Sequence, residues 1–202
     1  MDFAQNYQAY VEGFGERGST DFWNGLDKIR AMTQHYLDMG VDTVLRIEAT
    51  NCDGFVGSQT YQQFSLGAAS DFYPLAVSTA PEDISGNMGD AINTNNPSSG
   101  GNQNGAPFSA YDADHDNYQG NCAEGVHSGG WWYNACTEAD LNGLWSDDCS
   151  APGDTKPLGA IIWTPVTGFL AGLRTTRMLV RPANYPAPPP PSGDVIDLDM
   201  AL

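Results

Sequence analysis

Four stretches of the sequence have strand-like patterns of apolar and polar residues. In VDTVLRIEA, residues 41–49, the two kinds alternate, which is typical of a half-buried strand. RMLVRP, residues 177–182, is a late strand of the same alternating type. Two further short strands are predicted in YQQFSLG, residues 61–67, and in FYPLAVS, residues 72–78. The pattern therefore predicts a sheet whose strands come from distant parts of the chain.

One helix is expected near residue 22. Phe22, Leu26 and Ile29 form an apolar stripe at helical spacing in FWNGLDKIRAMTQ, and residues 19–21, Ser-Thr-Asp, offer capping side chains before it. Because Thr33 does not continue the stripe, the predicted helix is short.

The rest of the chain is rich in loop-forming residues. Residues 84–108 are mostly Asn, Ser, Gly and Pro, which is typical of a surface loop. Residues 109–160 are also largely loop, yet they concentrate Asp, Gly, Cys and Trp. A loop of that length in a compact domain is usually functional and needs cross-links. Residues 1–183 suit one domain, and the Pro-rich then acidic segment 184–202 is expected to be a disordered tail.

The charge balance limits the partners. The chain has 25 acidic and 8 basic side chains, for a net charge of −17. Nucleic acid and anionic membrane surfaces are therefore unfavourable partners, whereas divalent cations suit such a surface. No apolar run is long enough to span a bilayer. No G-x-S-x-G, H-E-x-x-H or P-loop motif is present and there are only three histidines, so no enzyme is expected.

The strongest chemical signal is the segment YDADHDNYQGNC. Asp112, Asp114 and Asp116 alternate within it, and three carboxylates so close together repel one another. A hard cation such as Ca²⁺ offsets this repulsion, and it also accepts backbone carbonyls as ligands. The alternative is an acidic turn whose aspartates cap backbone amides.

An EF-hand does not fit these residues. With Asp112 at the first loop position, Asn117 stands where the motif requires Gly, and Ala123 stands where it requires the bidentate Glu. No helical pattern flanks the segment either.

The four cysteines fit no C-x-x-C zinc or redox pattern. Cys122 and Cys136 bracket a Gly- and aromatic-rich loop, as a structural disulfide would. Cys52 and Cys149 form either a second disulfide or two buried thiols that act as small apolar side chains.

Several long motifs resemble one known family. FSAYDADHDNYQGNCAE, followed by GGWWYNAC and LNG, resembles the calcium and disulfide segment of fibrinogen-related domains, the group that includes the C-terminal domains of fibrinogen, ficolins, tachylectins and tenascin tails. YVEGFG, DFWNGLDKI, LRIEA, MGDAI and RMLVRP also match, so the resemblance runs from Asp2 to about Pro182 in one order. It implies an α+β fibrinogen C-terminal-like fold, with a twisted, mainly antiparallel sheet, short helices and a loop-rich calcium and ligand lobe.

The resemblance also assigns roles to residues. It implies that Ca²⁺ is held by the carboxylates of Asp114 and Asp116 and the carbonyls of Tyr118 and Gly120, with Asp112 outside the set. It further implies a Cys122–Cys136 disulfide and a cis peptide bond between Ala135 and Cys136.

Two departures concern the extent of the match and the cysteines. The chain begins inside the family pattern, without the N-terminal subdomain and without a secretory signal, so a fragment with an exposed sheet edge or core is expected. Cys52 stands where the family usually has an aromatic residue, so a bridge to Cys149 would be particular to this protein or its subgroup.

A third departure concerns the ligand. Family members that bind acetylated groups use an aromatic pocket beside the calcium loop, and here four of its positions have changed. His127, Pro157 and Ala171 stand in place of tyrosines, and Thr137 stands in place of a histidine. A shallow pocket is still expected at this place, and its predicted lining is His127, Trp131, Trp132, Tyr133, Ala135, Cys136, Thr137, Pro157 and Ala171. The alternatives are that both tryptophans belong partly to the core and that His127 is an exposed loop residue.

Two kinds of recognition function follow. The first is a secreted, calcium-dependent lectin that binds glycans or acetylated surface groups, as pattern-recognition proteins of innate immunity do. The second is an adhesion or signalling module that binds a protein receptor, with calcium purely structural. Homo-oligomers are expected of the full-length protein, because lectins usually need several copies for avidity.

Overall fold

The computed structural model describes residues 1–16, 19, 21–94, 100–150, 159–185 and 200–201. Its helices are α1 (Tyr7–Glu12), α2 (Leu26–Asp38), the 3₁₀ turn η1 (Ala69–Asp71), α3 (Glu82–Ser85), α4 (Cys122–Gly125) and α5 (Thr164–Thr167). Its strands are β1 (Phe14–Gly15), β2 (Phe22–Trp23), β3 (Thr43–Thr50), β4 (Val56–Leu66), β5 (Leu75–Thr79), β6 (Ala139–Asp140), β7 (Ile162–Trp163), β8 (Thr175–Pro182) and β9 (Met200–Ala201).

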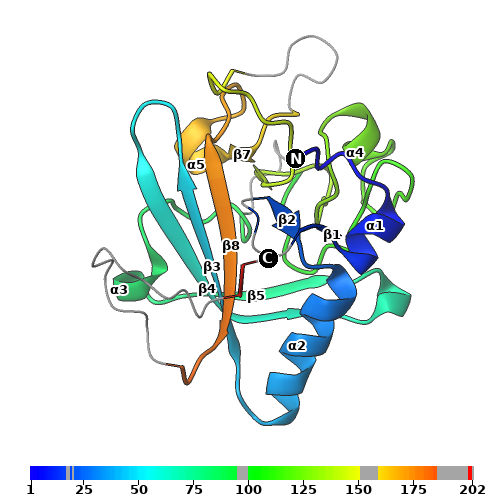
Figure 1. Ribbon diagram of the computed structural model, residues 1–202, viewed down its shortest axis with the longest axis vertical. Coiled ribbons are helices and arrows are strands. Elements are labelled where there is room, and N and C mark those ends of the chain that lie inside the picture. Colours follow the sequence, from blue (N-terminus) through cyan, green and yellow to red (C-terminus); the bar gives the residue numbers. More distant parts are fainter. Residues whose placement is uncertain (17–18, 20, 95–99, 151–158, 186–199, 202) are drawn as a thin grey trace.

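A five-stranded antiparallel sheet in the order β5-β4-β3-β8-β9 forms the centre of the molecule (Figure 1). The long strands β3 and β8 pair along their whole lengths, from Thr43 opposite Pro182 to Thr50 opposite Thr175. The α+β class and the mainly antiparallel sheet expected from the sequence are therefore confirmed.

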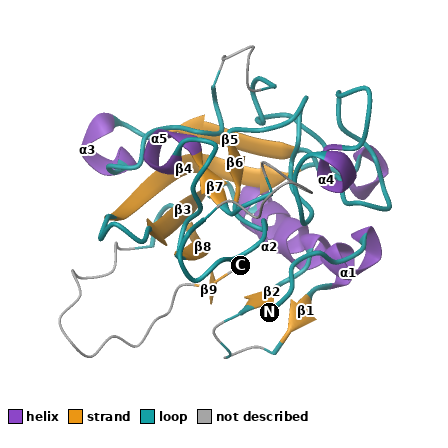
Figure 2. Ribbon diagram, turned by 90° about the horizontal axis from the view of Figure 1, so that it is seen from above, coloured by secondary structure: helices purple, strands orange, loops and turns teal. Residues whose placement is uncertain are grey.

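The core lies on one face of this sheet. Leu45 and Ile47 of β3 are fully buried, whereas Arg46 and Glu48 point to the other, partly exposed face. This is the two-residue alternation that the sequence predicts for β3. Helix α2 packs against β4. The loops around α4 and the short strands β1 and β2 lie to the side of the sheet, above α2 in Figure 1, and Figure 2 shows the same loops from above.

The predicted helix differs from the observed one at both ends. Phe22 does not start a helix: with Trp23 it forms β2, which pairs with β1, and α2 begins after Gly25. The helix also continues for 13 residues to Asp38. Thr33 is fully buried and its hydroxyl donates to the carbonyl of Arg30, so it serves as a core position although its side chain is polar.

Two predicted strands differ from the observed ones in where they begin. β4 begins at Val56, five residues before the predicted stretch, and β5 begins only at Leu75. Phe72 and Tyr73 have φ values of 63° and 52°, which are incompatible with a strand, so the first residues of FYPLAVS form a turn.

The end of the chain is described only in part. Residues 200–201 pair with Leu179 and Val180 of β8, where the sequence predicts no fixed structure. The remainder of the predicted tail, residues 186–199 and 202, lies outside the described residues. Among the helices of the described residues, none has the length and apolar character needed to cross a membrane.

Candidate functional site: the acidic loop and its disulfide

Two loops are tied side by side in the loop-rich lobe. Ser109 and Trp131 exchange two backbone hydrogen bonds of 3.0 Å. Asn117 donates its backbone N–H to the carbonyl of Asn134 over 2.7 Å and its side-chain amide to the Asn134 side chain over 2.8 Å. The acidic loop 109–121 is therefore held against the loop 131–136 at two separate places.

A disulfide closes the same pair of loops. Cys122 is bonded to Cys136, as predicted, and the Ala135–Cys136 peptide bond is cis, as the resemblance implied. Asn121 holds Cys122 in place at the start of α4. Its side-chain oxygen caps this helix, and its side-chain amide donates to the carbonyls of Ala110 and Tyr111. The acidic loop is thus cross-linked covalently at one end and by hydrogen bonds along its length.

The carboxylates of Asp114 and Asp116 both accept hydrogen bonds from backbone N–H groups of their own loop. The Asp116 carboxylate accepts the backbone N–H groups of Tyr118 and Cys122, each over 2.9 Å, and Asp114 accepts the N–H of Asp116 over 3.3 Å. Each of these oxygens keeps a further lone pair, so these hydrogen bonds orient the carboxylates without exhausting them as acceptors.

The electrostatics of this pair are unfavourable without a cation. Partial burial, and then the neighbouring charge of Asp114, raises the pKa of Asp116 above its ordinary value. Residues 109–125 contain no Lys or Arg that could balance the two carboxylates. The residues present therefore fit a hard divalent ion, which prefers carboxylate and carbonyl oxygens.

The expected set consists of two carboxylates and two backbone carbonyls. The described residues contain no group of three or more His, Cys, Asp or Glu side chains that could hold a metal ion. Asp112 has another role, because its carboxylate accepts the backbone N–H of Tyr7 over 2.8 Å and so ties the start of α1 to the loop.

His115 lies between the aspartates but turns away from them. Its ring stacks on Phe72 with the centroids 3.6 Å apart, and its Nδ1 lies 2.8 Å from the carbonyl oxygen of Phe108. It is half-buried and it is not directed at the aspartates. His35 is exposed on α2.

The structure differs from the predicted pocket in where it places the aromatic rings. Trp131, Trp132 and Tyr133 are at most 1% exposed, and each directs its polar atom inward. The two indole N–H groups donate to the Gln103 side chain and to the carbonyl of Tyr73. These rings therefore belong to the core of the lobe, because each buried polar atom has found a partner there.

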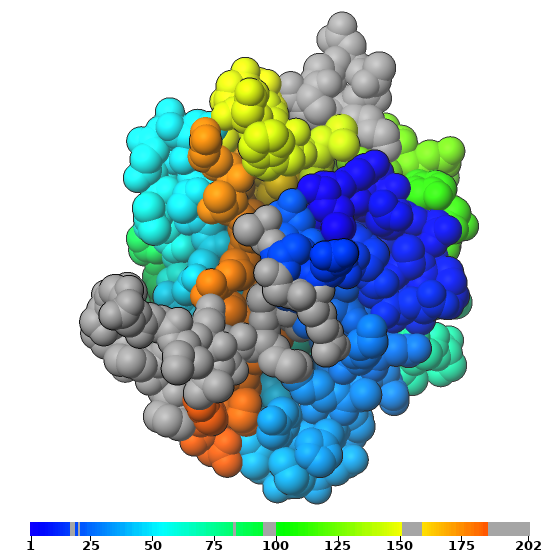
Figure 3. All heavy atoms as spheres, viewed as in Figure 1, coloured from blue at the N-terminus to red at the C-terminus, as the bar shows by residue number. Residues whose placement is uncertain are grey.

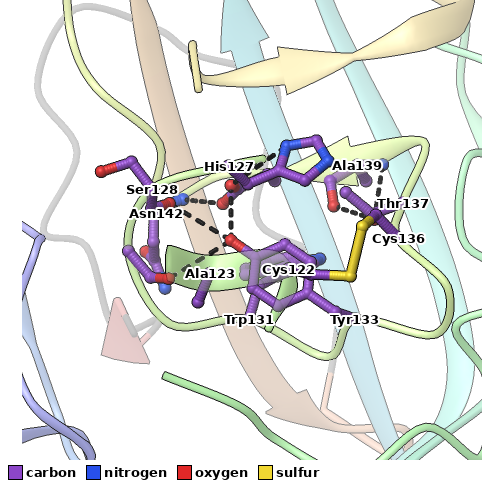
Figure 4. A network of polar contacts seen from close by, with 12 residues as sticks. Cys122, Ala123, His127, Ser128, Trp131, Tyr133, Cys136, Thr137, Ala139 and Asn142 are labelled. Carbon is purple, nitrogen blue, oxygen red and sulfur yellow. Dashed lines mark hydrogen bonds and ion pairs between the residues drawn. A yellow bond between two sulfur atoms is a disulfide. The ribbon is translucent and has the colours of Figure 1, made fainter. Parts of the chain in front are cut away.

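His127 is also buried, so it is neither a pocket wall nor an exposed loop residue. Its ring stacks on Tyr133 with the centroids 5.4 Å apart, and its Nδ1 lies 4.0 Å from the Asp140 carboxylate (Figure 4). The Tyr133 hydroxyl donates to Asp140 over 2.8 Å. Burial, and then the Asp140 charge, raises the pKa of Tyr133 far above its ordinary value, so the phenol stays protonated as a donor.

Of the other predicted pocket residues, few reach the surface. Ala135 is exposed and Ala171 is half-buried, whereas Cys136 and Thr137 are buried. The Thr137 hydroxyl donates to the carbonyl of Ala139, within its own loop. Pro157 lies outside the described residues. A ligand at this place would therefore contact the backbone and Ala135, not the rings.

The second pair of cysteines is also bonded. Cys52, just beyond the end of β3, is joined to Cys149 in the loop that follows LNG, across 97 residues of sequence. The alternative of two buried thiols is therefore wrong. This bridge ties the loop that contains Trp145 to the central sheet, and Trp145 donates its indole N–H to the carbonyl of Arg174, the residue before β8.

Comparisons with known proteins agree with this arrangement. Residues 1–183 match the family model of the C-terminal globular domain of fibrinogen beta and gamma chains. Human fibrinogen alpha chain is 32% identical over 194 residues, which cover 90% of this chain and 21% of that protein. Mouse angiopoietin-related protein 6 is 35% identical over 181 residues, covering 90% of this chain and 35% of that protein. The chain thus spans well under half the length of these two relatives.

Solved structures show the same fold. The fibrinogen-like globe domain of human ANGPTL6 superimposes with a TM-score of 0.77 and 30% identity, covering 92% of this chain and 74% of that one. Lamprey fibrin D-dimer, solved with the peptide ligand Gly-His-Arg-Pro-amide, gives a TM-score of 0.82 at 25% identity, over 98% of this chain and 62% of that one. The chain therefore belongs to the family of fibrinogen C-terminal globular domains, which are non-enzymatic binding modules.

Proposed function

We propose that this domain is an extracellular recognition module for protein or peptide ligands, with Ca²⁺ holding its acidic loop in shape. The ion would be bound by the carboxylates of Asp114 and Asp116 and by the carbonyls of Tyr118 and Gly120. The observation that carries this proposal is the pair of neighbouring carboxylates in a disulfide-closed loop that has no basic residue.

The chemistry of the loop supports calcium rather than a transition metal. Calcium takes six to eight oxygen ligands and tolerates irregular geometry, so two carboxylates, two carbonyls and water suffice. The nearby histidine is engaged with Phe72 and Phe108, which leaves oxygen as the donor type that faces the loop. A bound ion would also offset the repulsion that raises the pKa of Asp116.

Thermal unfolding with and without chelator tests the calcium site. At a Ca²⁺ concentration about 100 times its Kd, binding stabilises the folded state by about 2.7 kcal/mol, which corresponds to a rise in Tm of about 5–10 °C for a domain of this size. Asp114→Asn and Asp116→Asn should each reduce this rise to near zero. Asp112→Asn removes the same charge from the same loop and should keep it, because Asp112 contacts Tyr7 instead. A calcium response that survives both variants would exclude the proposed ligands.

Burial of the aromatic rings favours a protein or peptide ligand. Trp131, Trp132 and Tyr133 cannot offer their faces to a sugar in this conformation, because all three are at most 1% exposed. Among the structures similar to this chain, lamprey fibrin D-dimer was solved with a peptide ligand. Two disulfides in the described part of the chain fit an extracellular, oxidising environment.

A calcium-dependent lectin is the second candidate, favoured by a different pair of rings. Tyr111 and Tyr118 flank the aspartates and are 46% and 48% exposed, so their faces are available to stack on a sugar ring. A glycan array with and without chelator separates the two functions. Calcium-dependent binding that N-acetylglucosamine or acetate competes away would establish the lectin, and silence across the array would leave the protein-binding function.

A further inference from the structure

The two disulfides differ in how closely solvent approaches them. Cys52 is exposed in the turn between β3 and β4, whereas Cys122 and Cys136 are 0% and 8% exposed. In Figure 3 the yellow atoms of the loop 144–150 lie beside the cyan atoms of the β3–β4 hairpin, at the upper left of the molecule. A thiol reduces a disulfide by direct attack on one of its two sulfur atoms. The Cys52–Cys149 bridge is therefore the one that a reductant can approach from solvent.

The second cysteine of this bridge has a backbone conformation that favours glycine. Cys149 has a φ of +56°, which lies in the left-handed region that other residues seldom adopt. Its N–H donates to the carbonyl of Ser146 over 3.3 Å, and its carbonyl accepts the N–H of Gly172 over 2.8 Å. Such a conformation persists where the surroundings impose it, and the bridge is part of those surroundings. Opening the bridge would therefore let the backbone relax at Cys149.

Arg174 links the same loop to the central sheet by hydrogen bonds. Its N–H donates to the carbonyl of Thr50 at the end of β3 over 2.8 Å. Its carbonyl accepts the indole N–H of Trp145 over 2.9 Å, and its guanidinium donates to the carbonyl of Asp147 over 3.1 Å. The two bonds to the loop are exposed, so water competes for the same donors and acceptors. Without the bridge, these bonds would hold the loop only loosely.

Acidic side chains surround the bridge and limit the kind of reductant. Asp53 lies next to Cys52, and Asp147 and Asp148 lie just before its partner. Hydrogen bonds from two neighbouring serine hydroxyls lower the pKa of Asp148 to about 2, so this carboxylate is charged at neutral pH. The guanidinium of Arg174, bound to the Asp147 carbonyl, offsets only part of this negative charge. Because the attacking thiolate is also an anion, the site favours a reductant whose surface is neutral or basic.

We propose that the Cys52–Cys149 bridge is a site of reversible reduction by a protein dithiol of the C-x-x-C class with a neutral or basic surface around its attacking cysteine. The first thiolate of the dithiol attacks Sγ of Cys52, the S–S bond breaks, and Cys149 leaves as a thiolate that takes up a proton. The second thiol then attacks the mixed disulfide, which releases Cys52 as a thiol and oxidises the reductant to a disulfide. Reduction releases the loop 144–150 from the hairpin. The acidic loop takes no part, so this inference is independent of the calcium site.

Reduction of the full chain by dithiothreitol, a neutral dithiol, tests the site in the presence of Ca²⁺. Free thiols are trapped with iodoacetamide and located by peptide mapping in a mass spectrometer. Cys52 should be labelled at least about ten times faster than Cys122 and Cys136. Equal rates at the two bridges would overturn the proposal, and so would a Cys52–Cys149 bridge that stays closed until the whole domain unfolds.

Hydrogen exchange of the reduced protein tests the release of the loop. The amides of Gly172 and Arg174, which bond to the loop and to the end of β3, should exchange at least about tenfold faster than in the oxidised protein. The amides of Ser109 and Trp131, which bond to each other beside the calcium site, should keep their rates. A variant with alanine at both cysteines of the bridge should show the same pattern without any reductant. Unchanged Gly172 and Arg174 amides would contradict a release of the loop, and a loss of protection throughout would contradict a local one.

The charge of the reductant is tested with two small thiols. Cysteamine and 2-mercaptoethanesulfonate have the same carbon chain and opposite charges. In about 0.01 M salt and at equal thiolate concentration, cysteamine should open the bridge at least about fivefold faster, and the difference should shrink in about 0.15 M salt. Asp147→Asn should narrow this difference, whereas Asp38→Asn removes the same charge from the exposed end of α2 and should leave it nearly unchanged. Equal rates for the two thiols would rule out the neutral or basic surface assigned to the reductant.

Discussion

Gly100 packs its backbone directly against Ala135 and Cys136 in the loop 131–136. Its φ is +93°, and a Cβ placed on it would lie 2.2 Å from the backbone nitrogen of Cys136. Its carbonyl also accepts the N–H of Ala135. Gly100→Ala should therefore lower the free energy of unfolding by about 2–4 kcal/mol, through strain and collision together, as measured by denaturant unfolding.

Gly105→Ala is the matched control for this substitution. Gly105 has almost the same φ, +90°, but a Cβ there would meet nothing within 4 Å. It should cost only about 1 kcal/mol, the strain of the backbone conformation alone. If both variants lose the same stability, the close approach of Gly100 to Cys136 plays no part.

Tyr133 is the second residue whose role can be measured. Its hydroxyl donates to the fully buried Asp140 carboxylate, so Tyr133→Phe removes that donor. The expected loss is about 1–3 kcal/mol of unfolding free energy. Tyr111→Phe removes a hydroxyl from a ring that is 46% exposed and should change stability by less than about 0.5 kcal/mol. Equal losses would show that the Tyr133–Asp140 bond contributes nothing.

These residues also mark what the sequence could not predict about the site. The resemblance placed Cys122, Cys136 and the Ala135–Cys136 bond correctly, because covalent pairing and local backbone geometry follow the motif. Of the two alternatives for Trp131 and Trp132, pocket lining and core, the structure bears out the core. Which way a ring turns depends on distant partners such as Gln103 and Tyr73, and no local pattern records those contacts.

At the level of elements, the Cys52–Cys149 disulfide joins the end of β3 to the loop that contains Trp145. The bridge closes a loop of nearly 100 residues, so its removal should greatly increase the entropy of the unfolded state. Replacing both cysteines by alanine should lower the free energy of unfolding by about 2–4 kcal/mol. The rise in Tm with Ca²⁺ should stay, because neither cysteine contacts the acidic loop. Loss of the calcium response in this variant would show that the two parts of the molecule are coupled.

The elements also differ in how well the sequence predicts them. β3 is predictable because it is long and buries alternate residues from Leu45 to Ala49. β8 is equally long, but it buries Met178, Leu179 and Val180 in succession, so the alternation expected of it does not hold. The start of α2 is misplaced because Phe22 and Trp23 have helical spacing with Leu26 but pair with β1 instead. Two-residue strands such as β1 and β2 are too short to show a periodic pattern. They form because the two segments pair with each other, which the local sequence does not reveal.

At the scale of the whole molecule, the excess of acidic residues opposes folding. A net charge of −17 is brought together in a compact domain, and the resulting repulsion is long-ranged. The Debye length falls from about 30 Å in 0.01 M salt to about 8 Å in 0.15 M salt. Raising NaCl over that range in the presence of chelator should therefore stabilise the domain by about 1 kcal/mol, seen as a rise in Tm of about 2–4 °C.

Stabilisation by salt screening must be distinguished from stabilisation by Ca²⁺ bound at the acidic loop, and the rise in Tm with different ions distinguishes them. Ca²⁺ at about 1 mM hardly changes the ionic strength, so a rise in Tm beyond that of NaCl requires a site. Mg²⁺ has the same charge but holds its water tightly and demands octahedral geometry. It should therefore screen the acidic surface as Ca²⁺ does, without binding at Asp114 and Asp116. Asp114→Asn should keep the NaCl response of the parent and lose the calcium increment. Equal stabilisation by the two divalent ions in the parent would mean that they act on the acidic surface as a whole, and the assignment of Asp114 and Asp116 as ligands would be wrong.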